Sequence, residues 1–462
     1  MSDITVERLS SYTSSLSYEE LPPEVVHQTK RLMVDSLACG LGAFTSEPSK
    51  AIQDLASIFS GEITATVLGT GIKTTPDLAA FANGVMVRYL DYNDNYSGKG
   101  NAHPSDNIPV IMAAAEAYNS SGRDLITGII LAYEVQSAWV DTFRLQYAGP
   151  WDQAVYSSIS TPLGAGKVMG LNKEQLTEAL RISVVQGLSL HQARVGSISH
   201  WKACAVANSG RNGLFAAMLA ERGITGPPAI FDGRHGFFVG VTGGRVDLAP
   251  LAGESGNKHP FRIMKSSIKR FPAGFLSQTA IEGALEAREA LGIESGKQLR
   301  SVTIRTLDIA FNALAGDATR WHPKTRETAD HSIPYVVACA LLFGSVEIAH
   351  FDDEILRNPE LLELMEKVKV QSDPECDEGW PEAILNIVTV KTEDGRSYSA
   401  KIPWHLGHYK RPMSDKAIEE KFRLLSNGHL TSKQQDVALE TIWHLEEVKD
   451  LEKFMRLLSA HA

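Results

Sequence analysis

Apolar positions recur at helical spacing through most of the first 260 residues. Several of these runs begin next to prolines or small polar residues and end at a glycine, which are common marks of helix boundaries. The pattern predicts helices over residues 25–41, 78–89, 110–118, 124–143, 161–169, 171–188 and 201–222. The last run is rich in alanine and glycine, so we expect neighbouring helices to approach it closely. This part of the chain is predicted to form a helical domain.

The periodicity changes after about residue 265. Residues 301–307 and 387–390 alternate between apolar and polar, and an Asp-Gly turn at 394–395 predicts a β-hairpin over 386–402. Helices are expected among these strands, at 280–291 and 335–343, and again in the tail, at 415–425 and 432–458. We therefore predict a mainly α fold. Its domains are a helical domain of residues 1–265, an α+β domain of residues 266–402, and a helical tail of residues 403–462 that rejoins the first domain.

Composition narrows the class of protein. A chain of 462 residues is too long for one ordinary core, and 43% hydrophobic with 22% charged residues is typical of a soluble globular protein. The net charge of −10 and the lack of a basic patch with interleaved aromatics argue against nucleic-acid binding. The N-terminus has no signal-peptide pattern, and the best apolar run, 335–342, is too short to span a bilayer. We expect a cytoplasmic protein without membrane contact.

Metal and cofactor motifs are weak. The four cysteines are far apart, which argues against a disulfide framework and against an iron–sulfur cluster: Cys39, Cys204, Cys339 and Cys376. His405 and His408 have ligand-like spacing but lie in a loop without Cys or carboxylate, so we interpret them as structural or surface residues. The glycines of residues 69–73 fit neither a Walker motif nor a dinucleotide fingerprint. No metal and no cofactor are expected.

Ionisable side chains gather near predicted helix starts in four stretches, residues 91–107, 200–202, 269–272 and 329–332. The N-terminus of a helix has unpaired N–H groups and a partial positive charge, which attract anions. A Lys or His placed there opposes the dipole and costs stability. Repeated use of this arrangement indicates an anionic ligand.

Each candidate in these stretches has an ordinary alternative. Asp91 and Asp94 could bind a metal or act as a base, but an isolated pair of this spacing is more often a solvated loop. His103 precedes a capped helix and can titrate near neutrality, although a loop histidine is often only exposed. Lys202 could be a surface lysine, but the adjacent Trp201 indicates a partly buried position.

The later stretches also have two interpretations. Lys269 and Arg270 precede a Phe-Pro pair typical of a helix start, and an inter-domain salt bridge would explain them equally well. His331 precedes another Pro-marked helix start, where Asp330 and His331 could simply cap the helix.

Taken together, five segments resemble the MmgE/PrpD family in the family's order: residues 89–94 with 103–107, Lys202 with its small-residue helix, 268–273, 328–335 and 403–414. This family includes 2-methylcitrate dehydratase, cis-aconitate decarboxylase and iminodisuccinate epimerase. The resemblance covers nearly the whole chain. It implies a large all-helical domain formed by both chain ends, a smaller α+β lid domain between them, and a homodimer.

The resemblance also implies site residues. Asp91, His103, Lys202 and Lys269 match positions that line the family's active site between the domains, and we take them as catalytic. The candidates for substrate binding are Asn95, which falls where a Thr can occur, and Gln153, Arg270 and His331. Gln153 stands where many members have an active-site His, and residues 274–276 lack another His found nearby in some members.

The family's shared chemistry is change at a carbon next to a carboxylate. We expect Lys202 and Lys269 to neutralise the developing charge without a metal, and His103 to move the proton. Asp91 would orient a neighbour or take a second proton-transfer role, and His331 is a substitute acid for a departing hydroxyl. The expected function is a 2-methylcitrate dehydratase-like hydro-lyase acting on a small di- or tricarboxylate. The alternatives are an epimerase or decarboxylase of the family, with an iminodisuccinate- or cis-aconitate-like substrate, and a catalytically silent polycarboxylate-binding member.

Overall fold

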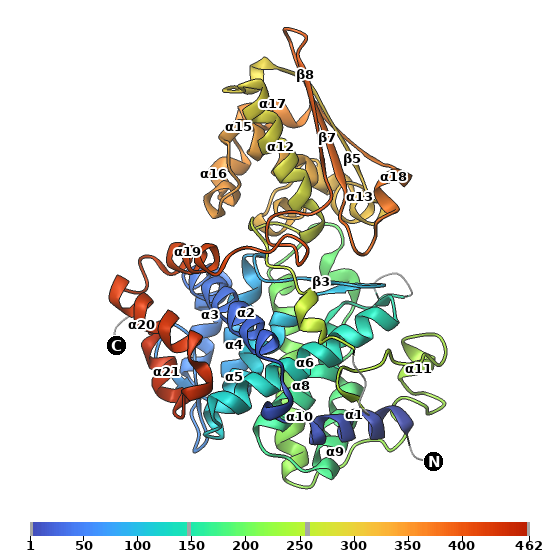
Figure 1. The fold of residues 1–462 in the computed structure, drawn as a ribbon, viewed down its shortest axis with the longest axis vertical. Coiled ribbons are helices and arrows are strands. Elements are labelled where there is room, and N and C mark those ends of the chain that lie inside the picture. The colour runs from blue at the N-terminus through green and yellow to red at the C-terminus, as the bar shows by residue number, and fades with distance from the viewer. Residues whose placement is uncertain (1–2, 146–148, 255–258, 460–462) are drawn as a thin grey trace.

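The computed structural model describes residues 3–145, 149–254 and 259–459. It is mainly α-helical, which confirms the predicted fold class. Figure 1 shows two parts: a large helical body that holds both chain ends, and a smaller part above it that contains the main sheet. We call the segment from Phe271 to Ile402 the lid and the rest of the chain the body.

Among the described residues, the N-terminal part of the body contains nine long helices: α1 (Ile4–Ser15), α2 (Pro23–Gly42), α3 (Glu47–Ser57), α4 (Pro76–Tyr89), α5 (Ile108–Ala117), α6 (Gly122–Thr142), α8 (Ala154–Val168), α9 (Lys173–Gln186) and α10 (Trp201–Glu221). The predicted helices all appear, although α8 starts earlier than expected from its composition. Two short antiparallel pairs join them, β1 (Ala65–Thr66) with β2 (Lys73–Thr74) and β3 (Tyr96–Ser97) with β4 (Asn101–Ala102). None of the described helices has the length and apolar content needed to cross a bilayer.

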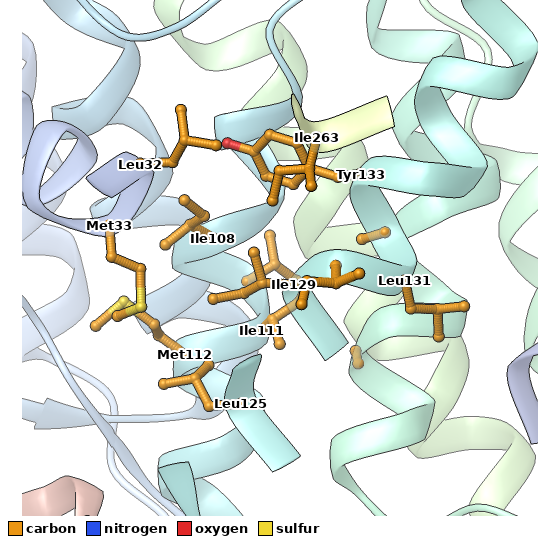
Figure 2. Packing of buried hydrophobic residues seen from close by; sticks show 14 of the residues in the cluster. Leu32, Met33, Ile108, Ile111, Met112, Leu125, Ile129, Leu131, Tyr133 and Ile263 are labelled. Carbon is orange, nitrogen blue, oxygen red and sulfur yellow. The ribbon is translucent and has the colours of Figure 1, made fainter. Parts of the chain in front are cut away.

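Helices α2, α5 and α6 supply the centre of the body core, where Leu32, Ile108 and Ile129 are fully buried (Figure 2). Helix α10 packs closely on its neighbours because its interface positions are small. A Cβ added to Gly210 would lie 2.6 Å from Cγ2 of Val110, so only glycine permits this helix spacing. The close approach expected for the 201–222 run is therefore present.

The tail returns to the body, where α19 (Asp415–Ser426) packs on α2, followed by α20 (Ser432–Trp443) and α21 (Leu451–Leu457). Figure 1 shows these red helices beside the blue N-terminal ones. The prediction of one continuous helix over 432–458 is wrong. The chain leaves the helix at His444, and α21 restarts at Asp450, whose side chain caps it by accepting a hydrogen bond from the Lys453 N–H at 3.0 Å.

The lid sheet has the order β6-β5-β7-β8, from β5 (Leu299–Thr306), β6 (Val368–Ser372), β7 (Asn386–Thr392) and β8 (Ser397–Ile402). Strands β7 and β8 form the predicted hairpin, whereas β6, parallel to β5, was not predicted. Helix α12 (Gln278–Leu291) packs on β7 and β8, and α15 (Ile333–Phe343) packs on α12. Shorter helices complete the lid: α13 (Asp308–Leu314), α14 (Arg326–Ala329), α16 (Asp353–Leu356), α17 (Pro359–Met365) and α18 (Pro374–Asp377).

The buried apolar residues form two large clusters. The body cluster reaches Ile268 and resumes at Met413, and the lid cluster extends from Phe271 to Val390. Two chain segments, one before the lid in sequence and one after it, therefore connect the lid to the body. The exact domain limits 1–265, 266–402 and 403–462 stay a prediction.

A buried lysine of the tail holds the first connection in place. Lys421 of α19 donates to Asp35 Oδ1 at 2.6 Å, to the Tyr92 carbonyl at 2.9 Å and to the Lys269 carbonyl at 3.1 Å. Its Nζ also lies 3.7 Å from the centroid of the Tyr92 ring. Lys421 thus fixes two backbone positions next to Asp91 and Lys269, which the sequence marked as site residues.

We predict that Lys421→Met destabilises the protein by about 3–5 kcal/mol, because it leaves Asp35 buried without its partner. The control is Lys416→Met, on the exposed face of the same helix, which should leave stability unchanged. Urea unfolding followed by circular dichroism measures both. Equal stability of the two variants would contradict the structural role of the Lys421 pair.

Candidate active site

A cavity of about 260 Å³ lies between the body and the lid. The body contributes Arg88, Asp91, Asn101, His103, Gln153, His191, Arg194, Val195 and Gly196. The lid contributes Gly274, Phe275, Leu276, Ile309, Asn312, Ala313, Leu314, Asp317, Arg320 and His331. Four of the candidates from the sequence, Asp91, His103, Gln153 and His331, thus share one cavity.

Asp91 is the centre of the site. It follows the C-terminus of α4 with a φ of +50°, in the left-handed region that Asp tolerates better than most residues but still at a cost. Arg88, one turn earlier on α4, contacts its Oδ1. Lys269 donates to the same oxygen and to the Asp91 carbonyl, both at 2.8 Å. The strained backbone is therefore held by two cations.

A second carboxylate reaches this cluster from the lid. Lys202, in the first turn of α10 as predicted, donates to both oxygens of Asp330 at 2.7 and 2.8 Å and lies 3.8 Å from Asp91 Oδ2. His331 Nδ1 lies 2.6 Å from Asp330 Oδ1 and 3.3 Å from Asp91 Oδ2. Ion pairs thus cross from the body to the lid.

The cluster has an excess positive charge. Three cations, Arg88, Lys202 and Lys269, surround two carboxylates, and all five side chains are buried. Burial alone raises the pKa of Asp91, but the surrounding cations outweigh it and hold that pKa well below its usual range. Burial lowers the pKa of Lys269 to about 8, assisted by the other cations and opposed by Asp91. One uncompensated positive charge beside a cavity favours an anionic ligand.

Two of the cavity histidines, His331 and His103, are neutral at physiological pH. Burial, reinforced by Lys202, lowers the pKa of His331 to about 4 despite the nearby carboxylates. Burial and the cations Arg88 and Lys269 hold the pKa of His103 well below its ordinary value. Nδ1 of His103 lies 2.5 Å from the carbonyl oxygen of Asp94. A carbonyl only accepts, so Nδ1 carries the proton and Nε2 carries a basic lone pair.

Asp94 helps to position His103 and does not pair with Asp91. It accepts from the Ser105 N–H at 3.1 Å, the Ser105 hydroxyl at 2.6 Å and the Tyr133 hydroxyl at 3.0 Å. Burial raises the pKa of Asp94 to about 6, against these hydrogen bonds. Its contacts close the loop between residues 94 and 105, and so fix the position of His103.

Three candidates lie elsewhere than the sequence indicated. Lys269 is not at a helix start, because the next long helix, α12, begins only at Gln278. Asn95 is buried outside the cavity and pairs with the Ser267 backbone at 2.8 and 2.9 Å. Arg270 is not among the cavity-lining residues: it is partly exposed, forms an ion pair with Glu282 at 3.0 Å and lies over the Phe271 ring, so its role in substrate binding stays a prediction. The partner Glu282 lies on α12, which begins at Gln278, shortly after Arg270 in the chain.

Three potential metal ligands converge, since one ligand atom each of Asp91, Asp330 and His331 lies within 4.8 Å of the others. Lys202 Nζ contacts the same set, 2.7 Å from Asp330 Oδ1, 3.1 Å from His331 Nδ1 and 3.8 Å from Asp91 Oδ2. A side-chain ammonium thus takes the central position of this group. The expectation of a metal-free reaction stays a prediction.

Sequence reasoning missed four basic residues that line the cavity: Arg88, His191, Arg194 and Arg320. The spacing of three between Arg88 and Asp91 was a usable signal, because such a pair meets at the end of a helix. Arg194 and Arg320 lie in short irregular segments on either side of the domain boundary. No motif marks them, so only the fold brings them together.

Comparisons with known proteins agree with this architecture. The MmgE/PrpD N-terminal domain matches residues 7–248, and the MmgE/PrpD C-terminal domain matches residues 271–447. Human cis-aconitate decarboxylase is 24% identical over 98% of this chain and 94% of its own length. The 2-methylcitrate dehydratase of Salmonella typhi is 28% identical over 91% of each chain, and the probable 2-methylcitrate dehydratase of Saccharomyces cerevisiae is 27% identical over 89% of this chain and 84% of its own.

The similar proteins are named as enzymes, a dehydratase and a decarboxylase, which supports a lyase-like function at the level of the family. The two domain matches together span nearly the whole chain: the N-terminal match lies within the body, and the C-terminal match covers the lid and the tail helices α19 and α20. The protein belongs to the MmgE/PrpD family.

Proposed function

We propose that this protein is a metal-independent hydro-lyase that acts next to a carboxylate on a small di- or tricarboxylate. The observation that supports this most is the cluster around Asp91, which has one excess positive charge and borders the same cavity as the neutral His103. Such a site attracts a carboxylate and holds a base against it. The small-molecule substrate and the homodimer expected from the family remain part of this proposal.

In the proposed reaction, His103 Nε2 removes the proton from the carbon next to a carboxylate. The electron pair moves onto that carboxylate, whose negative charge then increases. Arg88 lines the cavity, and Lys202 and Lys269 lie directly behind Asp91. Their fixed charges stabilise the intermediate without rearranging, as preorganised groups do in other enzymes.

The departing hydroxyl needs a proton, and His331 is the candidate donor because it lines the cavity from the lid side. Because the ring is neutral at rest, it must first gain a proton, which Lys202 Nζ, 3.1 Å from His331 Nδ1, can supply, and the cationic ring then donates from Nε2. Asp91 and Asp330 both lie near Nδ1 of that ring, at 3.3 and 2.6 Å, and would stabilise its cationic form. Asp91 thereby orients the acid, while His103 acts as the base.

An epimerase of the same family is the second candidate. It needs one group to remove a proton and another to return it on the opposite face of the carbon. His103 comes from the body and His331 from the lid, and both line the cavity. Gln153, in a position where an imidazole was expected, leaves these two as the predicted site imidazoles.

Incubation with citrate-like and aspartate-derived acids in deuterated water, followed by NMR, separates these reactions. Dehydration should produce alkene signals, a vinylic proton from citrate or a methyl group on the double bond from 2-methylcitrate; epimerisation should exchange deuterium without net loss of substrate, and decarboxylation should release CO2. Repeating the assay with EDTA tests independence from metals. Absence of any exchange across the panel would contradict an enzymatic function and favour a silent binding protein.

The pH profile should have a basic limb near pH 8. Lys269 loses its proton as the pH rises through about 8, so the cluster loses its excess positive charge and kcat/KM should fall above that pH. The requirement for the base is the opposite, because His103 must be unprotonated at Nε2 to accept a proton. Its lowered pKa keeps the ring neutral down to pH values well below 6.5. Steady-state rates from pH 5.5 to 9.5 measure the basic limb. A flat profile through pH 9.5 would contradict the role of Lys269.

Two substitutions should separate proton transfer from charge stabilisation. We expect His103→Ala to lower kcat about 100- to 10,000-fold, as loss of a general base does. Lys202→Ala should raise KM and also lower kcat, by about 100- to 1,000-fold if it acts as an electrostatic stabiliser. The exposed His235→Ala is the matched control, and circular dichroism verifies folding. Near-normal turnover of His103→Ala on the true substrate would show that another group is the base.

A further inference from the structure

Arg320 is a buried cation without a counter-ion. It ends a short 3-10 turn of the lid (Ala318–Arg320), is 3% exposed and lines the cavity. Nη2 donates to the Arg194 carbonyl at 3.2 Å, but Nε and Nη1 have no hydrogen-bond partner among the described residues. Within the same residues Arg320 forms no ion pair. An uncompensated charge in such a place is costly unless an anion joins it.

The nearest acidic groups do not compensate this charge. The Asp317 carboxylate accepts from the Thr319 N–H and hydroxyl, both at 2.8 Å, and Asp330 is paired with Lys202. Consistently, burial lowers the pKa of Arg320 although both carboxylates act to raise it. Two guanidinium donors therefore remain available at the cavity wall.

Arg194 presents a further donor from the body side. Its Nε and Nη2 bind the buried Asp152 at 2.5 and 3.2 Å, which orients the guanidinium rigidly. Its Nη1 is buried and has no partner in the described part of the chain. Because Arg320 donates to the backbone of Arg194, the two residues are direct neighbours across the domain boundary.

We propose that Arg320, together with Nη1 of Arg194, binds a second carboxylate of the substrate, away from the carbon that reacts at His103. This rests on the proposed function and deepens it, because it names the side chains that would hold the second carboxylate of that di- or tricarboxylate. The planar fork of donors in a guanidinium matches a carboxylate, which can accept two parallel hydrogen bonds. A hydroxyl or an amide would not supply the missing negative charge.

The location of this subsite also links substrate binding to lid position. The segment that holds Arg320 contacts the body through the Ile198 N–H, which donates to Thr328 Oγ1 at 3.4 Å, and through Thr319, which donates to the Gly196 carbonyl at 3.4 Å. These are long, weak hydrogen bonds. A carboxylate bound between Arg194 and Arg320 adds a charged bridge across the same boundary.

Calorimetric titration of the full chain with glutarate and with butyrate tests the subsite, since the two ligands differ mainly by one carboxylate. Wild type should bind glutarate more tightly. Arg320→Met should weaken glutarate binding about 10- to 100-fold, the effect of losing hydrogen bonds to a charged group, and leave butyrate binding unchanged. Arg320→Lys should restore part of the loss. Arg357→Met, an exposed arginine of the lid, is the matched control.

Three results would overturn the proposal. These are unchanged glutarate affinity in Arg320→Met, an equal loss for both ligands, and a clear drop in the melting temperature of ligand-free Arg320→Met. The last would reveal a structural role of the guanidinium beyond its hydrogen bond to the Arg194 carbonyl, whereas removal of an uncompensated buried charge should leave stability equal or higher. The outcome is independent of the proposed reaction, because a protein without turnover can still lose glutarate binding on this substitution.

Discussion

The contact on which the site depends is the buried salt bridge between Lys202 of the body and Asp330 of the lid. Neither charge can remain in this dry interior without the other. Their pairing at 2.7 Å therefore fixes how the lid sits on α10. It also brings His331 to Asp91, and so completes a cluster whose members come from four separate parts of the sequence.

Around this salt bridge, two residues adopt locally unfavourable positions, and neighbouring charged side chains compensate for each. Asp91 has a strained backbone, and Arg88 and Lys269 hold it. Lys202 stands at a helix N-terminus against the dipole, and carboxylates surround it. Functional sites are where such departures are expected, because the surrounding structure must compensate for them. The body core, by contrast, follows the ordinary rules of helix packing.

The elements that could be predicted from the sequence are those whose signals are local. Prolines, caps and glycines bounded α2, α6 and α10 well, and the Asp-Gly turn identified the β7–β8 hairpin. Strand β6 was not predicted because it is only five residues long and no turn motif marks it, and the break before α21 lacks Gly and Pro. The Arg194–Arg320 pair could not be predicted, because these two residues come together only where the lid meets the body. Asp91 and His103 were identified by a family resemblance that spans the chain.

The contact between α2 and α19 has a consequence for biosynthesis. Asp35 and Lys421 are 386 positions apart in the chain, and the whole lid lies between them. During synthesis from the N-terminus, the first helices are made long before the lysine that neutralises Asp35. Until the tail emerges, Asp35 must stay hydrated or protonated, and the carbonyls of Tyr92 and Lys269 lack their shared donor. The Asp35–Lys421 pair can therefore form only after the tail has been made, so the backbone beside Asp91 and Lys269 gains this support late in synthesis.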